Sequence, residues 1–558
     1  MHLGRREEAI VCCERALEID ANLKQAWNNK GVALSDLGRK EEAIACYDRA
    51  LEIDAKYEGA WSNKGNALSA LGRNDDALAC YGQALEINPR DALPWNNKAA
   101  ALSILGRQEE AIACYDRVLE IDPRNANMWY DKGTGLLTLV RREEAVACFN
   151  KALEINPKDV RAWNNKANAL SDIGRKEEAI ACCDRALEID PRLPSAYYNK
   201  GNALSDLGRK EEAIACYERA LEINPRAPNT LVRKGAALSD LGRKEEAIAC
   251  YDRALEIDAK GAHVLFNKGK ALSEMGRYQQ ALACYDDALG IEPRFAAAWS
   301  NKGDALSDLG RKEEAILCYH RALESDPTLV VAWLNKGLVL SELGRMEEAI
   351  AHYDRALQID PKYAGAWHNK GLALWALGRN EEAIACFDRT LEIDPKALPS
   401  WDAKGTLLAR MGRLQEAMVC YDKALAIHHT FTNAWNNKGT VLSELGRKEE
   451  AIACYERALE IDPRFAVAWN AKGRVLSDLG RNDEAVVCYD RSLEIEPRDA
   501  RVWASKGIAL SDLGRRKEAA EAYRRFIACV PTSNKQLIQR VEEMIGKLEG
   551  NASPETLN

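Results

Sequence analysis

Several features of membrane, secreted and nucleic-acid-binding proteins are missing from this sequence. No apolar stretch approaches the roughly 20 residues that a membrane-spanning helix needs, and residues 1–8 lack the apolar core of a secretory signal. The 558 residues carry 78 Lys and Arg against 86 Asp and Glu, a net charge of −8, so the basic excess that neutralises nucleic-acid phosphates is absent. These absences predict a cytoplasmic protein with neither a membrane nor a nucleic acid as its partner.

Catalytic and metal-binding signatures are missing as well. The sequence has no Gly-rich phosphate loop, no nucleophile elbow and no pairing of His with a carboxylate at catalytic spacing. Its 7 His residues are scattered, and the neighbours His428 and His429 point in different directions from a helix end. We therefore expect no enzymatic activity, no cofactor and no bound metal.

A 34-residue repeat dominates what is present. After Trp27, one position recurs fourteen times at intervals of 34 residues without insertion or deletion, which defines fifteen repeats. The position is occupied by Trp27, Trp61, Trp95, Trp129, Trp163, Tyr197, Leu231, Leu265, Trp299, Trp333, Trp367, Trp401, Trp435, Trp469 and Trp503. Such regular spacing excludes the several unrelated domains that the length alone would suggest.

The pattern within each repeat predicts two helices. In residues 24–57, apolar residues recur at helical spacing up to residue 37, and Gly38 stands where a glycine ends a helix. A second apolar stripe runs over residues 39–54, with Glu41 and Glu42 at the favourable end of the helix dipole. Proline follows this stripe in twelve of the fifteen repeats and prevents its continuation. Each repeat is therefore predicted to be an antiparallel helical hairpin.

The recurring residues resemble those of the tetratricopeptide repeat family. The match is carried by the positions of Trp27, Gly31, Ala43, Tyr47, Ala50 and Pro89. We expect Ala43 to face Gly31, so that the two helices of a hairpin approach closely. The resemblance implies an all-α fold, a right-handed α-α superhelix (solenoid) of about fifteen 34-residue helix-turn-helix repeats.

The two ends of the array differ from its middle. Residues 1–23 supply only the second helix of a repeat, and residues 24–533 contain the fifteen tandem repeats. Residues 534–550 carry one apolar stripe, which predicts a C-terminal capping helix, and the polar residues 551–558 predict a disordered tail. Because residues 3–20 lack a partner helix, we expect either a fragment of a longer array or association with another copy through this open end.

Two further positions are repeated along the array. Fourteen of the 17 Cys residues occupy the position of Cys46 on the second helix, at a separation too large for disulfides. We interpret them as small packing residues in a reducing compartment. Lys30 has a counterpart in all fifteen repeats, and we expect its amine to reach water or a nearby carboxylate.

The resemblance implies that the first helices line the inner face of the superhelix. Side chains one, two, five and nine residues after the Trp27 position would then point into a groove. Two residues after it, ten repeats have asparagine: Asn29, Asn63, Asn97, Asn165, Asn199, Asn267, Asn301, Asn335, Asn369 and Asn437. Because an amide both donates and accepts, these residues can bind an extended backbone without reading its sequence. The alternative is that asparagine is the family's default residue, inherited by duplication.

An acid stands nine residues after the Trp27 position in ten repeats, for example at Asp36. An acid near a helix C-terminus is unfavourable against the helix dipole. Arginine follows three residues later in every repeat, as Arg39 does, so we expect a local ion pair across the turn. The groove would keep a mildly negative polar character, which suits polar or basic extended segments.

One stretch of the groove departs from this polar pattern. In residues 194–295, basic and aromatic side chains replace polar ones, and the candidate specific pocket consists of Tyr198, Asn202, Arg233, His263, Phe266 and Lys270. Neutral drift of single copies is the alternative. Some family members clamp a carboxylate with a lysine at the Asn28 position, and no repeat has lysine there.

Together these patterns predict a non-catalytic protein–protein interaction scaffold that binds extended protein segments in its groove. A first alternative is a structural rod that self-associates through the open end at residues 3–20. A second alternative is the substrate-selecting arm of an enzyme whose catalytic module is absent from this sequence.

Overall fold

The computed structural model describes residues 2–531 and 534–550, which form helices and turns with no strand among them. The all-α helical-repeat class is therefore confirmed. The predicted disordered tail, residues 551–558, lies outside the described residues. The helices gather into two compact units, Met1–Ile291 and Glu292–Asn558, a division that the regular spacing does not predict.

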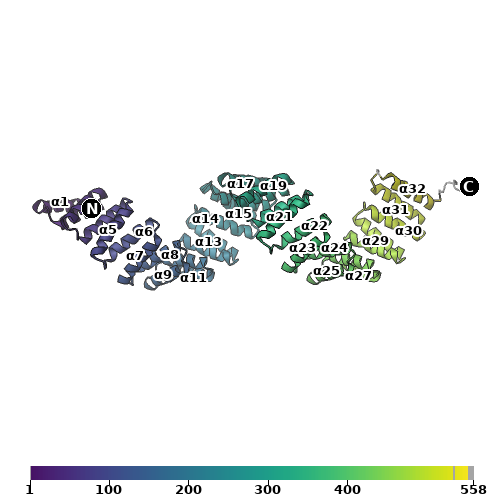
Figure 1. Cartoon of the computed structure of the whole chain (residues 1–558), viewed down its shortest axis with the longest axis horizontal. Coiled ribbons are helices and arrows are strands. Elements are labelled where there is room, and N and C mark those ends of the chain that lie inside the picture. The colour runs from purple at the N-terminus through teal and green to yellow at the C-terminus, as the bar shows by residue number, and fades with distance from the viewer. Residues whose placement is uncertain (1, 532–533, 551–558) are drawn as a thin grey trace. The chain divides into compact units, whose positions relative to one another are not determined.

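The helices of the N-terminal unit follow one another as hairpins (Figure 1). They are α1 (His2–Ile19), α2 (Lys24–Asp36), α3 (Lys40–Ile53), α4 (Glu58–Ala70), α5 (Asn74–Ile87), α6 (Ala92–Ile104), α7 (Gln108–Ile121), α8 (Ala126–Thr138), α9 (Arg142–Ile155), α10 (Val160–Asp172), α11 (Lys176–Ile189), α12 (Pro194–Asp206), α13 (Lys210–Ile223), α14 (Pro228–Asp240), α15 (Lys244–Ile257), α16 (Ala262–Glu274) and α17 (Tyr278–Ile291).

The C-terminal unit repeats the same arrangement. Its helices are α18 (Ala296–Asp308), α19 (Lys312–Ser325), α20 (Val330–Glu342), α21 (Met346–Ile359), α22 (Ala364–Ala376), α23 (Asn380–Ile393), α24 (Leu398–Arg410), α25 (Leu414–Ile427), α26 (Thr432–Glu444), α27 (Lys448–Ile461), α28 (Ala466–Asp478), α29 (Asn482–Ile495), α30 (Ala500–Asp512), α31 (Arg516–Cys529) and α32 (Lys535–Leu548). The last of these lies where the capping helix is predicted.

A three-residue turn joins the two helices of each repeat. In the α2–α3 turn, Gly38 has a φ of +83°, and the Arg39 N–H donates to the Leu34 carbonyl at 3.0 Å. This left-handed conformation favours glycine, which has no Cβ to clash with the neighbouring carbonyl. Val140 takes the place of the glycine in the α8–α9 turn and keeps the positive φ, at 63°.

The Trp27 position fixes the turn between repeats. The indole Nε1–H of Trp95 donates to the Pro89 carbonyl at 3.0 Å, and Trp27 makes the same bond to the Ala21 carbonyl at 2.9 Å. The indole N–H is a donor only, and it satisfies a carbonyl of the turn that follows the preceding helix. In the repeats that have tryptophan, one side chain thus ties the first helix to the turn before it.

The close approach within a hairpin is made by glycine and an aromatic ring. A Cβ added to Gly31 would lie 2.6 Å from Cε1 of Tyr47, so the tyrosine ring lies directly against this glycine. Ala43 is fully buried in the same cluster as Tyr47, and its contact with Gly31 stays a prediction. Two hairpins have alanine at the glycine position: α10–α11 combines Ala167 with the smaller Cys183, whereas α6–α7 combines Ala99 with Tyr115, which stays buried.

First helices form the inner side of each unit. Successive first helices, such as α10 and α12 or α26 and α28, are in contact, whereas successive second helices make no comparable contact within the described residues. The inner surface is therefore built from the first helices, as the resemblance implies. We call the side chains one, two, five and nine residues after the Trp27 position the groove face.

Candidate functional site

Asparagines of the groove face join neighbouring first helices. The side-chain amide of Asn199 donates to Oδ1 of Asn164 in the preceding repeat at 3.0 Å, and Asn63 donates to Asn28 at the same distance. Similar bonds link Asn97 to Asn66, Asn165 to Tyr130, Asn335 to Asp304 and Asn437 to Asp402. We call this series the Asn ladder. These asparagines therefore have a structural role between repeats that the sequence pattern alone does not reveal.

The ladder leaves part of each amide available. A carboxamide has two N–H donors and one acceptor oxygen, and a bond such as that from Asn199 to Asn164 uses one N–H. The ten asparagines of the ladder position are half-buried, apart from Asn29, which is exposed. The remaining donor can still meet a peptide group, and so can the acceptor, except at Asn437, whose oxygen accepts from Asn436.

The acids of the groove face pair with the preceding repeat. Asp172 lies 2.9 Å from Arg142, and Asp206 pairs with Lys176, in each case a residue 30 positions earlier. The same relation joins Arg6 to Asp36, Lys210 to Asp240, Lys244 to Glu274 and Lys312 to Glu342. Positive charge from the neighbouring repeat thus offsets the unfavourable position of these acids at a helix C-terminus.

The predicted local pair between Asp36 and Arg39 is wrong. Arg39 instead forms a two-point contact with Glu42, whose Oε2 lies 2.5 Å from Nη2 and whose Oε1 lies 2.6 Å from Nε. This hydrogen bond from Arg39 lowers the pKa of the Glu42 carboxyl. The arginine reaches forward onto the second helix because Glu42 stands in its first turn, one helical turn away.

The repeated lysine lies as expected. Lys30 Nζ is 2.8 Å from Glu14 on the preceding second helix and 5.7 Å from the centre of the Trp27 ring. The carboxylate contact recurs at Lys64, Lys132, Lys200, Lys234, Lys268, Lys370, Lys404, Lys438, Lys472 and Lys506. The prediction that the amine reaches a nearby carboxylate is confirmed for these repeats.

A polar hollow opens on the groove face of α10, α12 and α14. It has a volume of about 130 Å³ and is lined by Asn168, Ser171, Asp172, Lys176, Asn199, Asn202, Asp206 and Arg233. Two of the six candidate pocket residues, Asn202 and Arg233, line this hollow. Asn202 accepts a hydrogen bond from the Tyr217 hydroxyl at 2.8 Å, so its carbonyl oxygen is already engaged.

The other four candidate pocket residues lie around neighbouring helices. The ring of Tyr198 is 6.3 Å from that of Tyr217, and the ring of Phe266 is 6.2 Å from that of Tyr285. Lys270 lies 4.0 Å from Glu274 on the same helix, and His263 is exposed at the start of α16. The six residues therefore occupy three successive first helices, and only two of them meet at one hollow.

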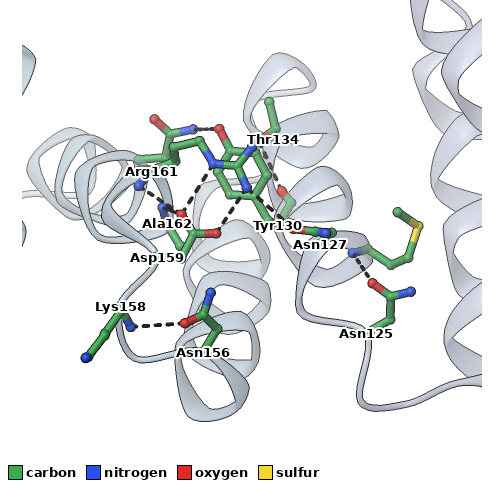
Figure 2. A network of polar contacts seen from close by, with 11 residues as sticks. Asn125, Asn127, Tyr130, Thr134, Asn156, Lys158, Asp159, Arg161 and Ala162 are labelled. Atoms are coloured by element: carbon green, nitrogen blue, oxygen red, sulfur yellow. Dashed lines mark hydrogen bonds and ion pairs between the residues drawn. The ribbon is translucent and has the colours of Figure 1, made fainter. Parts of the chain in front are cut away.

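A second cluster, between α8 and α10, was not predicted. Figure 2 shows the Arg161 guanidinium over the ring of Tyr130, 4.5 Å from its centre, and beside Asp159 at 3.3 Å. Burial raises the pKa of the nearby Asp131 carboxyl, although Arg161 acts in the opposite direction. The available signal was that Asp131 replaces a residue that is asparagine in ten of the other fourteen repeats, beside a tyrosine at position 130.

The C-terminal unit has a hollow of mixed polar and apolar lining that was also missed. A space of about 530 Å³ between α22 and α24 is lined by residues that include Leu372, Trp375, Arg410 and Met411. The guanidinium of Arg410 is 5.8 Å from the centre of the Trp375 ring. Arg410 stands where most repeats have an acid. At the position of Trp375, the two adjacent repeats have the small residues Ser341 and Ala409.

The remaining expectations concern disulfides, metal sites, membrane-spanning helices and self-association. All 17 cysteines lie in described segments and are free thiols, and most of them are buried. No group of three or more potential metal ligands occurs in the part of the chain that the structure describes.

Of the helices in residues 2–531 and 534–550, none combines the length and apolarity required to cross a membrane. Self-association through residues 3–20 stays a prediction, with Val11 46% and Ile19 88% exposed on α1.

Comparison with known proteins identifies the repeat. A tetratricopeptide repeat model matches residues 25–57, 59–91, 92–125, 160–193, 194–226, 364–397 and 432–465. Other tetratricopeptide repeat models match residues 1–23, 126–159, 226–292, 266–330, 398–427, 454–487 and 500–528, and a TPR repeat model matches 337–378. No match was found among curated proteins.

Solved structures similar to this chain include three repeat proteins or complexes. YrrB, described as a TPR protein with an unusual peptide-binding site, is 28% identical over 33% of this chain and 95% of its own, with a TM-score of 0.30. The APC/C hetero-tetramer Cut9-Hcn1 is 17% identical over 88% and 96%, with a TM-score of 0.38. Naa15/Naa10 bound to HypK-THB is 15% identical over 100% and 98%, also with a TM-score of 0.38. Because repeat models match most of residues 1–528, the chain belongs to the tetratricopeptide repeat family.

Proposed function

We propose that this protein is a non-catalytic interaction scaffold that binds an extended, polar protein segment on the groove face of α10, α12 and α14. The observation that carries the proposal is the polar hollow there, which gathers amide, hydroxyl, carboxylate and guanidinium groups from consecutive helices. Tetratricopeptide repeat proteins generally act as such scaffolds. The free thiols also suit a reducing compartment, so we place the protein in the cytoplasm.

Two residues of the hollow have polar groups free for a ligand. Asn168 and Arg233 are exposed, and neither makes an internal side-chain hydrogen bond or ion pair among the described residues. An extended peptide presents N–H and C=O groups alternately, and these require both an acceptor and a donor. Asn168 supplies both, and Arg233 supplies donors to a carbonyl or carboxylate.

The charge of the hollow favours polar over strongly charged segments. Asp172 is paired with Arg142, and Asp206 is paired with Lys176. Because both acids are already compensated, a basic segment gains less from them than the net acid count of the groove face suggests. We therefore propose a polar partner segment held mainly by hydrogen bonds, with Arg233 as the one unpaired charge of the hollow.

Selection of peptides by the full-length protein tests this function. A displayed library of random octapeptides is selected, and the affinity of enriched peptides is measured by fluorescence anisotropy. The double variant Asn168→Ala with Arg233→Ala should weaken binding about thirtyfold, because each side chain contributes on the order of 1 kcal/mol. Alanine occupies the Asn168 position naturally at Ala236, and the Arg233 position at Ala471, so folding should be retained.

A matched control separates groove binding from general charge effects. Arg219 is an exposed arginine on the second helix α13, where it pairs with Glu222 at 2.5 Å. Arg219→Ala should leave the affinity unchanged. Equal affinity of the double variant and the unaltered protein, or an equal loss in Arg219→Ala, would contradict binding at this hollow.

A further inference from the structure

The Asn ladder is interrupted on the groove face of α26, α28 and α30. Four of the six rungs run from an amide to the residue 35 positions earlier, as in Asn199 to Asn164 and Asn437 to Asp402, and the other two span 31 positions. The donor that would reach Asn436 belongs at position 471, where the chain has alanine. The donor for Asn470 belongs at position 505, where it has serine. Both residues therefore lack the amide that completes a rung elsewhere.

Two acceptor oxygens are left without a partner by this interruption. Oδ1 of Asn436 and Oδ1 of Asn470 are buried and accept no hydrogen bond from any described residue. The Asn436 side chain is 7% exposed, and its Nδ2 donates to Asn437 at 3.2 Å, which fixes the orientation of the amide. Leaving a buried acceptor unsatisfied costs free energy, so this site is stabilised when a donor enters it.

Both asparagines line the same hollow. It has a volume of about 190 Å³, and Ala471, Arg474 and Glu496 also line it. Arg474 and Glu496 make no ion pair in the described part of the chain, and Asp499 and Arg501 at the rim pair with each other at 2.9 Å. The hollow thus combines two unsatisfied acceptors with a guanidinium donor. Its two positive and two negative side chains give it no net charge.

We propose that this hollow binds a primary carboxamide, the side-chain group of asparagine or glutamine on a partner segment. A primary carboxamide has two N–H donors and one acceptor oxygen, which match the two asparagine oxygens and the Arg474 guanidinium. A carboxylate has no donor for the asparagines, and an ammonium group has no acceptor for Arg474. The inference rests on the proposed function, in that the partner lies extended along the groove face.

Alanine at position 471 makes room for this ligand group. An asparagine there would place its own amide toward Asn436, as Asn437 does toward Asp402 at 2.9 Å. The protein would then satisfy its own acceptor and fill part of the hollow. Ala471→Asn is therefore a variant that closes the site by restoring a contact the fold already uses in other repeats.

Titration of the full-length protein with acetamide tests the proposal without a known partner. The side-chain amide signals of Asn436 and Asn470 are followed by ¹⁵N NMR and assigned with Asn436→Ser and Asn470→Ser. Acetamide should shift both signals saturably. Acetate and N,N-dimethylacetamide, which carry no N–H, should require at least about tenfold higher concentration for the same shift, because a hydrogen-bonding site rejects analogues that leave it unpaired.

Two variants decide whether the response belongs to this hollow. Ala471→Asn should abolish the acetamide shift, whereas Ala236→Asn, the same change on the groove face of α14, should leave it intact. Equal shifts with acetate or dimethylacetamide, or an unchanged response in Ala471→Asn, would overturn the carboxamide site. Selected peptides that still bind at Asn168 and Arg233 in that case would show that the proposed function survives without it.

Discussion

The side-chain amide of Asn199 on α12 donates a hydrogen bond of 3.0 Å to Oδ1 of Asn164 on α10. This contact lies on the groove face, so a residue type expected to bind a ligand also joins one repeat to the next. Stability and binding are therefore coupled along the groove, and variants of the ladder must be compared with variants of unbonded groove residues.

Removing a rung of the Asn ladder should lower stability. Asn199→Ala leaves Oδ1 of Asn164 without its donor, and we expect a loss of about 1 kcal/mol in the free energy of unfolding. Asn168→Ala, on the same face but without an internal bond, should change it by less than about 0.5 kcal/mol. Urea unfolding followed by circular dichroism measures both. Equal destabilisation by the two variants would show that the rung carries no stability.

The contact between glycine and tyrosine should accept a methyl group only at a cost in stability, since Tyr115, which stands opposite Ala99, is 6% exposed and Tyr217 is 1% exposed. A Cβ at Gly201 would lie 2.5 Å from Cε1 of Tyr217, which is buried, so the ring or the helix must shift. We expect Gly201→Ala to destabilise the protein by about 1–3 kcal/mol in thermal or urea unfolding.

A double-mutant cycle tests the cause of that loss. The α10–α11 hairpin combines Ala167 with Cys183, which shows that a small partner accommodates alanine at the glycine position. Gly201→Ala should therefore cost at least about 1 kcal/mol less in a Tyr217→Cys background than in the unaltered protein. Additive losses would mean that the ring is not the obstacle.

Val140 holds a backbone conformation that suits glycine. Its φ of 63° costs a β-branched residue about 1–2 kcal/mol, and its side chain is 60% exposed, so little packing offsets this cost. Allowing for the greater freedom of glycine in the unfolded chain, Val140→Gly should raise stability by about 0.5–1 kcal/mol. Thermal unfolding followed by circular dichroism measures this change. In the same experiment Gly174→Val, at the equivalent turn, should lower the stability. A lower melting temperature for Val140→Gly would refute the argument.

Asp304 should make stability depend on pH. Burial raises the pKa of its carboxyl in the folded protein, although it accepts hydrogen bonds from Tyr319 at 2.7 Å and Asn335 at 2.8 Å. A raised folded pKa means that the native state holds the proton more tightly than the unfolded state. The contribution of Asp304 to stability is then greatest below the ordinary aspartate pKa of about 3.9 and falls as the pH rises through the folded value.

Substitution by asparagine isolates this effect. Asn202 holds the equivalent position and accepts the same tyrosine hydrogen bond, so Asp304→Asn preserves the contact without the charge. The variant should be more stable than the unaltered protein at pH 7, and its advantage should shrink as the pH approaches 4. Asp512→Asn at an exposed position is the control and should show no such trend. A constant difference at all pH values would exclude Asp304 as the titrating group.

Sequence spacing was a good guide to the helices and turns of a repeat and to the environment of Lys30, whose amine reaches a carboxylate 16 residues earlier. It failed for Asp36, because the arginine three residues away turns to Glu42 and the true partner, Arg6, lies in the preceding repeat. Local spacing favours local partners, whereas stacking brings residues 30 or 35 positions apart into contact.

The 34-residue period was sufficient to define the helices, their turns and the family, because these depend on apolar spacing, glycine and proline within a single repeat. Stacking alone decided which amides are occupied by a neighbouring repeat and which, as at Asn436 and Asn470, are left open. The physical reason is that a hydrogen bond across two repeats depends on the side chains of both, so a single alanine at position 471 changes the chemistry of its neighbour.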